Sequence, residues 1–256
     1  MNSNNSNNSN NSNKSNNSNN SNNSNKSNLA NKRKKSIFKN DISQVFKLIS
    51  EKRSFFALIL VNLLVQLYIT YYVSENIKVD EEKKGAKKFS SKFIAALLAT
   101  LVIILILALV PMPAWLKFIF FSLFSGAFGV ILGYRKSGLD PNVIKTAFVG
   151  TASIFVSMFI FGLALIMSGI QLGFKTALVL LFALLALIIV SIVQIFIVQS
   201  SLLKKIIVIS SLILFSVYIV YDTNSILQRN YDGDFITASL NYYLDLINIF
   251  SALLGD

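Results

Sequence analysis

Two carboxylates inside apolar segments are the residues of this sequence best placed to do chemistry. Of the twelve acidic residues, only Asp222 and Asp245 fall within long apolar runs. A carboxylate at bilayer depth costs at least ~2.5–3.5 kcal/mol on insertion scales, and such residues usually mark ion or proton paths. This pair is therefore the candidate functional centre.

The spacing of polar residues around each Asp predicts that the two carboxylates meet. Polar side chains recur every three or four residues in both apolar runs, so each set shares one face of a helix. If a turn near residues 231–234 joins two antiparallel helices, the carboxylates lie roughly 12 and 16 Å from that turn, within reach of each other. Asp232 or Asp234 would cap the last helix. The side chains expected to support a bound ion are Tyr218, Ser225, Asn241 and Asn248.

Two carboxylates so close together cannot both carry a charge cheaply. One expectation is that the pair shares a proton. Another is that Asp222 and Asp245 transiently bind calcium, a hard cation that prefers oxygen ligands. A third interpretation is structural, a hydrogen-bonded pair that locks two helices, although Asn or Ser would do this at lower cost. No Gly-rich phosphate loop occurs, and no cofactor is expected apart from calcium as a permeant ion.

The composition excludes most soluble enzyme classes. The chain has 256 residues, of which 54% are hydrophobic and 14% are charged, whereas soluble domains are about 25% charged. It contains neither Cys nor His, which removes disulfides, thiol nucleophiles, the usual zinc sites and Ser-His-Asp arrangements.

Long apolar runs divide the rest of the chain into candidate membrane spans, each near the roughly 20 residues that a spanning helix needs. Short connections with Pro, Gly, Arg and Lys separate them, as expected at membrane interfaces. The pattern predicts an all-α membrane protein, a seven-helix bundle over residues 55–256 with the lipid bilayer as its surroundings. The seven predicted spans are Phe55–Val73, Phe93–Val110, Ala114–Gly133, Val143–Ser168, Phe174–Gln199, Ile206–Leu227 and Phe235–Leu254.

Residues 1–54 differ sharply from the remainder. Their first 31 residues are almost all Asn and Ser, and the segment holds ten of the 24 basic residues against two acids. Such a composition buries no core and predicts a disordered tail. The basic cluster at 32–35 is interpreted as a juxtamembrane patch rather than a nucleic-acid signal, because membrane spans follow it. No nucleic-acid partner is expected.

Around the two Asp residues the sequence resembles the Bax inhibitor (transmembrane Bax inhibitor motif) family. The stretch Ser216–Asn224 is similar to the family's "Y-D-T" segment, and Gly233–Phe250 is similar to its "A-x-x-L-Y-L-D-I-I-N-L-F" segment. The resemblance implies a seven-helix protein of internal membranes, in the endoplasmic reticulum or Golgi, or of the plasma membrane if the source is prokaryotic. It further implies a pH-sensitive calcium leak, suppression of cell death and cell-death regulatory membrane proteins as partners. The family's paired aspartates, its proposed pH sensor and gate, carry over to Asp222 and Asp245.

The chain departs from the family at the end of the second span. An Arg that latches onto the aspartates is common there, but this sequence has Leu109-Val-Pro-Met-Pro113. Without that cation the pair must neutralise itself by a shared proton or a metal ion, so the latch mechanism of the family does not transfer directly.

Two alternatives to a channel remain open at this point. A non-conducting regulator would bind other membrane proteins through small-residue faces, such as Gly126/Gly129/Gly133 or Gly162/Gly169, although these faces are expected to pack within the bundle. An intramembrane aspartyl protease would use two carboxyls that share a proton to activate water. Its second Asp belongs in a G-x-G-D motif, whereas Asp245 follows Tyr-Tyr-Leu, and we therefore expect no enzymatic activity.

Overall fold

The computed structural model describes residues 43, 47, 50–77, 91–194, 197, 200–228 and 233–255. Contacts divide the chain into two units, Met1–Lys47 and Leu48–Asp256, and the second unit carries the architecture described below. Most of the predicted disordered tail, residues 1–54, lies outside the described residues, so its disorder stays a prediction there, whereas its last five residues, 50–54, form the start of the first helix.

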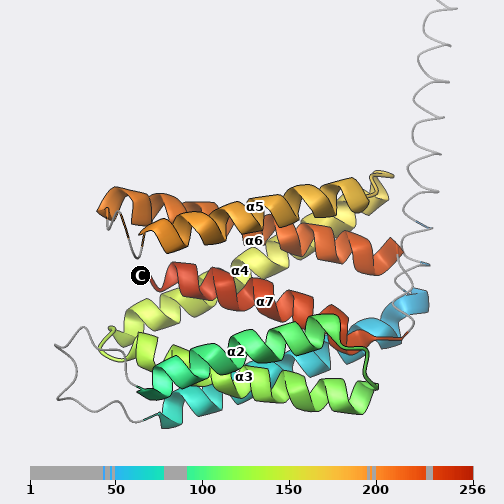
Figure 1. Cartoon of the computed structure of the whole chain (residues 1–256). Helices are drawn as coiled ribbons and strands as arrows, with labels where there is room; N and C mark the ends of the chain where they lie inside the picture. Colours follow the sequence, from blue (N-terminus) through green and yellow to red (C-terminus); the bar gives the residue numbers. More distant parts are fainter. Residues whose placement is uncertain are drawn as a thin grey trace, which may run out of the picture. The chain divides into compact units, whose positions relative to one another are not determined.

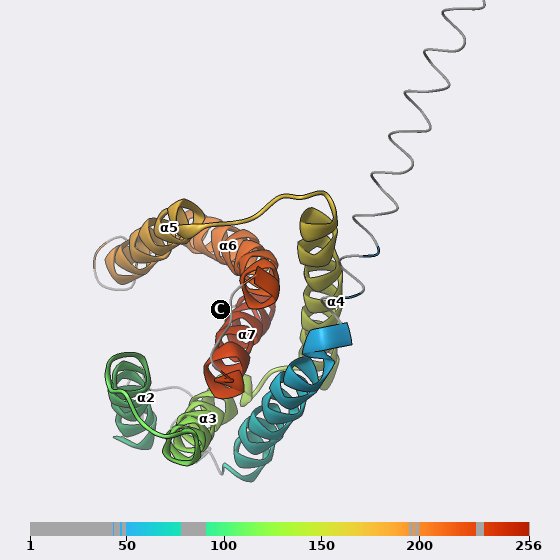
Figure 2. The same cartoon turned by 90° about the vertical axis from the view of Figure 1, so that its right-hand side faces the viewer.

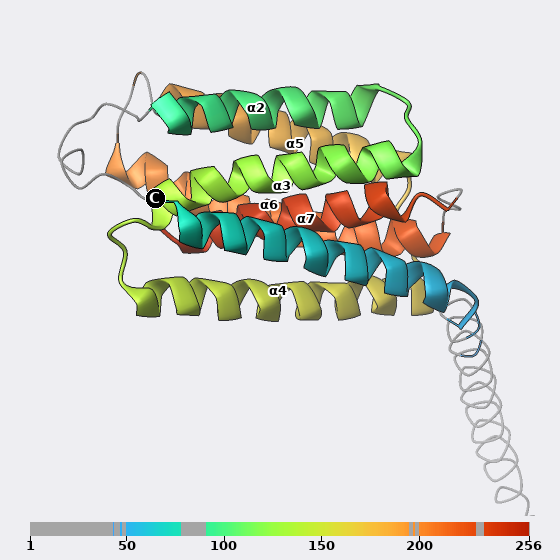
Figure 3. The same ribbon diagram turned by 90° about the horizontal axis from the view of Figure 1, so that it is seen from below.

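Within the second unit, long helices run nearly parallel or antiparallel to one another, as Figures 1 and 3 show from two directions. The described residues form helices and turns without any strand. Each helix coincides with a predicted apolar run, with ends that differ by at most six residues, which confirms the predicted all-helical bundle. The helices are the first helix, Ser50–Asn76, then α2 (Ser91–Leu109), α3 (Ala114–Lys136), α4 (Pro141–Met167), α5 (Phe174–Val193), α6 (Ser201–Gln228) and α7 (Phe235–Leu253).

Six of these helices are long and apolar enough to cross a membrane: the first helix and α2 to α6. The chain is accordingly an integral membrane protein. The helix α7 was also predicted to span, and its 19 residues give a length of roughly 28 Å at 1.5 Å per residue. Polar side chains lower the mean hydropathy of α7. The position of α7 in the bundle explains why it can carry these polar side chains.

The helix α7 is the central element of the bundle. Figure 2 shows it (red) between α6, α4, α3 and the first helix, and it contacts α3, α4 and α6. Eleven of its 19 residues are buried, whereas Leu180 is the single buried residue of α5. Because protein surrounds α7, its polar groups meet other helices instead of lipid tails, while α5 presents an apolar surface of the kind that suits lipid.

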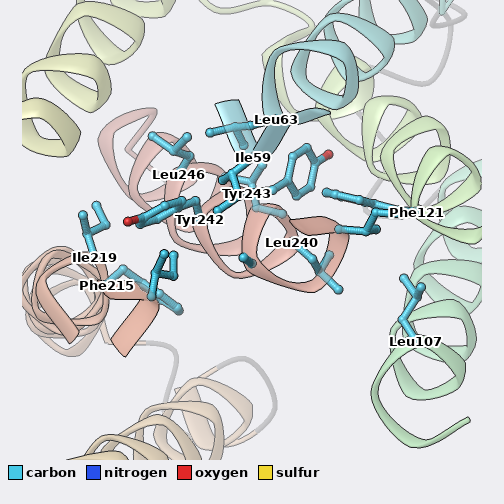
Figure 4. Close-up of a cluster of buried hydrophobic side chains, with 14 of the residues drawn as sticks. Ile59, Leu63, Leu107, Phe121, Phe215, Ile219, Leu240, Tyr242, Tyr243 and Leu246 are labelled. Carbon is cyan, nitrogen blue, oxygen red and sulfur yellow. The ribbon is translucent and has the colours of Figure 1, made fainter. Parts of the chain in front are cut away.

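Two consecutive tyrosines set the rotation of α7. Tyr242 and Tyr243 are both fully buried, and Figure 4 shows their rings pointing to opposite sides of the helix. The Tyr243 ring meets the edge of Phe121 from α3 at a centroid distance of 5.2 Å, and the Tyr242 ring meets Phe155 from α4 at 5.3 Å. Each such aromatic pair is worth about 0.5–1.5 kcal/mol beyond burial, so turning α7 about its axis would break both.

Local chemistry sets the two ends of α4. The Asp140 side chain accepts a hydrogen bond from the backbone N–H of Asn142 at 2.8 Å, which is the usual role of an N-cap residue. After the last turn, Gly169 adopts a φ of +75°, and the N–H of Ile170 donates to the Leu165 carbonyl at 2.9 Å. This glycine-terminated end directs the loop between α4 and α5 back toward α6.

Glycines allow three close approaches between helices. A Cβ atom built on Gly129 would lie 2.7 Å from the Thr70 carbonyl oxygen of the first helix, and one on Gly162 would lie 2.8 Å from Cβ of Thr223 in α6. Gly133 packs on the first helix in the same way, whereas no atom lies within 4 Å of a Cβ on Gly126 or Gly169. The small-residue faces are therefore largely used inside the bundle.

Candidate ion site

The two predicted acids come together at the contact between α6 and α7. Asp222 and Asp245 are only 5% and 3% exposed, and their carboxyl groups lie close enough to interact directly. An ionised carboxylate has only acceptor oxygens, so a hydrogen bond between two carboxyls requires a proton on one of them. A pair that shares a proton fits this placement of two buried carboxyls, and the shared proton stays a prediction.

Oxygen atoms around this pair retain unused bonding capacity. Oδ2 of Asp245 and Oγ of Ser225 are buried and have no hydrogen-bond partner among the described residues. Buried polar atoms normally have partners, and leaving one unpaired costs ~1–3 kcal/mol. Such atoms are suited to contact a proton, a water molecule or a cation that enters the site.

The other residues predicted to support a bound ion differ in how they lie relative to the two acids. Tyr218, half-buried one helical turn before Asp222, lies within electrostatic range of both acids. Asn248 is half-buried, and its Nδ2 donates to the Leu244 carbonyl of its own helix at 2.7 Å, so its amide group is turned to the backbone. Asn241 is half-buried on α7. Of the four predicted supporting residues, the electrostatic relation to both acids is thus shown for Tyr218, and Ser225 lies one helical turn after Asp222 on α6.

This donor set suits weak cation binding better than a resident metal centre. Calcium normally takes six to eight oxygen ligands. Within the described part of the chain, no group of three or more acidic side chains is arranged to hold a metal ion. Two carboxyls with a few neutral oxygens would supply only part of a coordination shell, which favours transient contact with a passing ion.

Hydrogen bonds and close packing hold the helix segment that carries Asp222. The hydroxyl groups of Thr223 and Tyr242 lie 2.9 Å apart and link α6 to α7. On another side of α6, Gly162 lets α4 approach the Val220 carbonyl and the Thr223 side chain. The residues on either side of Asp222 are therefore fixed against two different helices.

The fully buried side chain of Asn224 attaches the loop between α4 and α5 to α6. Its Oδ1 accepts from the N–H of Leu172 at 2.9 Å, and its Nδ2 donates to the Ile170 carbonyl at 3.0 Å. One amide thereby satisfies two backbone groups that the turn leaves unpaired. Sequence analysis did not single out Asn224, because an Asn two residues after an Asp gives no sign of a partner more than fifty residues away.

A cation that the sequence did not indicate lies at the end of α6. Nζ of Lys52, in the first helix, donates to the carbonyls of Ile226 and Leu227 at 3.1 and 3.0 Å. The last carbonyls of a helix lack partners within the helix and interact favourably with positive charge. Lys52 therefore caps the end of α6 about one turn after Asp222. In the sequence it is one of many basic residues that precede the first apolar run.

A row of polar side chains from the first helix forms a second set of polar contacts, on the other side of α7. Asn62, Gln66, Thr70 and Ser74 recur at every fourth position of the first helix, and all four are buried. Asn62 donates to Ser239 of α7, and the Gln66 and Thr70 side chains bond to Ser125 of α3. The hydroxyls of Thr70 and Tyr243 also meet, at 2.5 Å. Sequence analysis missed this stripe, although polar residues spaced by four in an apolar helix are a legible signal.

The predicted cap of α7 is present at Asp234. Its side chain accepts from the N–H of Thr237 at 3.0 Å and forms an ion pair with Lys117 of α3. Burial alone would raise the pKa of this carboxyl, but the bonds from Lys117 and Thr237 outweigh burial and lower the pKa below its ordinary value. The start of α7 is thus held by a charge that persists at neutral pH. The other expected cap, Asp232, lies outside the described residues.

The fold and site define a polytopic helical membrane protein with a buried acidic pair between two central helices. Residues 47–255 match the family described as "Inhibitor of apoptosis-promoting Bax1", and the chain belongs to this Bax inhibitor family, as the sequence predicted. Protein LIFEGUARD 4 of Arabidopsis thaliana is 27% identical over 139 residues, which are 54% of this chain and 56% of that protein. Protein LIFEGUARD 1 of the same plant is 48% identical over 44 residues, 17% of this chain and 18% of that protein. The match thus spans about half the length of the first relative.

Proposed function

We propose that the protein is a calcium-permeable leak channel of internal membranes, in which the Asp222/Asp245 pair is both gate and pH sensor. The observation that carries the proposal is the meeting of two buried carboxyls from adjacent helices, one of which has an oxygen without a hydrogen-bond partner among the described residues. Buried acids within membrane helices are costly and usually serve ion or proton movement. Family membership is consistent with this activity.

Protons and cations would compete for the same oxygens. With one proton bound, the pair is hydrogen-bonded and bridges α6 to α7. Loss of that proton would leave two close negative charges that repel each other and attract a hard cation. A site with so few ligands would hold the ion weakly, which conduction requires because the ion must also leave. Flux would therefore depend on pH, and the tie between α6 and α7 would change with it.

Calcium flux into vesicles that contain the purified full chain tests this proposal. Flux is measured at two pH values for the wild type, Asp222→Asn and Asp245→Asn. Each substitution keeps the size of the side chain and its ability to hydrogen-bond, but removes one titrating group. We expect loss of flux or of its pH dependence in both variants. The matched control is Asp140→Asn, which makes the same change at the cap of α4, where Asn is an equally good cap.

Unchanged flux and pH dependence in Asp222→Asn and Asp245→Asn would reject the channel mechanism. Abolished flux in Asp140→Asn would show that the assay reports folding rather than the site.

We further propose that the channel resides in the endoplasmic reticulum or Golgi and acts in cells by regulating cell death, together with other regulatory membrane proteins. Family membership supports this role, and no catalytic activity is proposed. Protection from cell death in cells that express the wild type or the double variant Asp222→Asn/Asp245→Asn separates two routes. Protection that survives the double substitution would favour the non-conducting regulator over the channel.

A further inference from the structure

The hydroxyl groups of Tyr242 and Tyr243 attach α7 to different helices on its two sides. Tyr242 bonds to Thr223 of α6 at 2.9 Å, and Tyr243 bonds to Thr70 of the first helix at 2.5 Å. All four side chains are buried, and Figure 4 shows the two tyrosine rings pointing apart. The two contacts are chemically alike, so a difference between them must come from what lies beside each one.

The bond between Tyr242 and Thr223 is the neighbour of the acidic pair. Asp222 directly precedes Thr223 in α6, and Asp245 follows Tyr242 by three residues in α7. These separations correspond to roughly 1.5 and 4.5 Å along the two helix axes. A movement of α6 against α7 at the hydroxyl contact therefore also moves the two carboxyl groups relative to each other.

The contacts of the Thr223 hydroxyl assign the direction of this bond. Its Oγ1 lies 2.7 Å from the Ile219 carbonyl and 2.9 Å from the Tyr242 hydroxyl. A carbonyl oxygen can only accept, so the single proton of the Thr223 hydroxyl is donated to Ile219, and Tyr242 is the donor to Thr223. Tyr242 is thereby connected through Thr223 to the backbone of α6, one turn before Thr223.

The helix α4 supports both partners of this bond from behind. Gly162 lets α4 approach so closely that a Cβ atom there would lie 2.8 Å from Cβ of Thr223. The ring of Tyr242 meets the rings of Phe155 and Phe159 of α4 edge-on, at centroid distances of 5.3 and 6.4 Å. Because interiors packed this closely transmit small displacements, the bond fixes how α6 and α7 face each other.

We propose that Tyr242 and Thr223 are positioning residues that set the separation of Asp222 and Asp245. The inference rests on the proposed channel function, because it concerns the regulation of the same site. Without the bond, the two carboxyls would move apart, which weakens their mutual repulsion and their joint hold on a proton or a cation. The pH at which calcium flux changes therefore depends on this hydrogen bond.

The pH profile of calcium flux into vesicles that contain the purified full chain tests the proposal. Tyr242→Phe removes one hydroxyl and keeps the ring, and Tyr243→Phe is the matched control, because it makes the same change on the other side of α7. We expect the midpoint of the profile to move to lower pH by roughly 0.5–1 pH unit in Tyr242→Phe, since one hydrogen bond is worth about that much protonation free energy. The midpoint of Tyr243→Phe should equal that of the wild type.

Substitutions of Thr223 probe the same bond from α6. Thr223→Val removes the hydroxyl and keeps the shape of the side chain, so it should move the midpoint as Tyr242→Phe does. Thr223→Ser keeps the hydroxyl and should retain the midpoint of the wild type. The double variant Thr223→Val/Tyr242→Phe should move the midpoint no further than either single variant, because both changes break one bond.

A second measurement distinguishes failure of this inference from failure of the channel proposal. Melting temperatures are compared for Tyr242→Phe, Asp245→Asn and the double variant, and for the same set with Tyr243→Phe. If the bond positions the acids, the losses in the first set are not additive, whereas those in the second set are. Vesicles of the wild type without calcium flux would reject the channel, and the melting temperatures would then decide the positioning role.

The proposal is overturned if Tyr242→Phe and Tyr243→Phe move the midpoint equally, or if Thr223→Ser moves it as far as Thr223→Val. A Tyr242→Phe variant with reduced flux and an unchanged midpoint would show that the hydroxyl only supports folding, which also overturns it. Additive losses of melting temperature in Tyr242→Phe/Asp245→Asn would do the same.

Discussion

Replacing Gly162 by Ala should push α4 away from the segment of α6 that carries Asp222. A Cβ atom at this position would lie 2.8 Å from Cβ of Thr223 and 3.0 Å from the Val220 carbonyl oxygen. Carbon atoms in contact prefer about 3.5–4.0 Å. Neither neighbour is the end of a flexible side chain, so relief requires one helix to move.

The magnitude follows from comparison with Gly126→Ala, which also adds one methyl group within a helix but meets no atom within 4 Å. Both substitutions gain the same helix propensity, up to ~1 kcal/mol, so this contribution cancels in the difference. What remains is the overpacking cost at Gly162, about 1–3 kcal/mol. For a domain of this size, 1 kcal/mol corresponds to about 2–4 °C in melting temperature, so the two variants should differ by about 2–12 °C.

The assay is thermal unfolding of the purified variants in one detergent at pH 7, followed by circular dichroism. Gly150→Ala provides an intermediate case, because its Cβ would meet only the terminal Cδ1 of Leu253, at 3.0 Å. The expected order of melting temperatures is Gly126→Ala, then Gly150→Ala, then Gly162→Ala as the lowest. Calcium flux should also change most in Gly162→Ala, since Val220 and Thr223 flank Asp222.

Equal melting temperatures for Gly162→Ala and Gly126→Ala, within 1 °C, would refute the close approach of α4 to α6. A lower melting temperature for Gly126→Ala than for Gly162→Ala would contradict the argument even more directly.

Two other perturbations test the elements that position the site. Asn224→Ala removes both hydrogen bonds to the loop between α4 and α5, so stability should fall by about 2 kcal/mol, and limited proteolysis should cleave that loop sooner than in the wild type. Asp234→Asn removes the ion pair with Lys117. Because the folded-state pKa of Asp234 lies below its ordinary value, its charge stabilises the fold above about pH 4, and this contribution disappears as the pH falls through the lowered pKa. The melting temperature of Asp234→Asn should therefore lie below that of the wild type at pH 7, with the gap closing in acid; a gap that widens in acid would reverse the assignment.

The positions of the helices and the choice of the acidic pair were predictable from the sequence. A membrane span must satisfy its own backbone hydrogen bonds, so a long apolar run has few alternatives to a helix. Charged residues are so costly within such runs that Asp222 and Asp245 stand out without further information. The three- and four-residue spacing of polar side chains also placed both on facing sides of adjacent helices.

Other parts of the site depend on contacts between distant segments. The polar residues Asn62 to Ser74, at every fourth position of the first helix, are visible in the sequence. Because neutral polar side chains cost less in a membrane than charged ones, they did not stand out as candidate functional residues. Lys52 reaches carbonyls of α6 that lie 174 and 175 residues away in the chain. The composition around a lysine at the start of an apolar run does not indicate which distant group that lysine will contact.

The central position of α7 was decided by the tertiary structure alone. Periodicity shows that a helix has a polar face, but it does not show which helix covers that face. The sequence determined how many helices form, where they lie to within about six residues, and which two acids they bury, because membrane insertion responds to local composition. Only the packed bundle determined that α7 has polar neighbours on both sides, since this depends on how side chains from four separate helices fit around it.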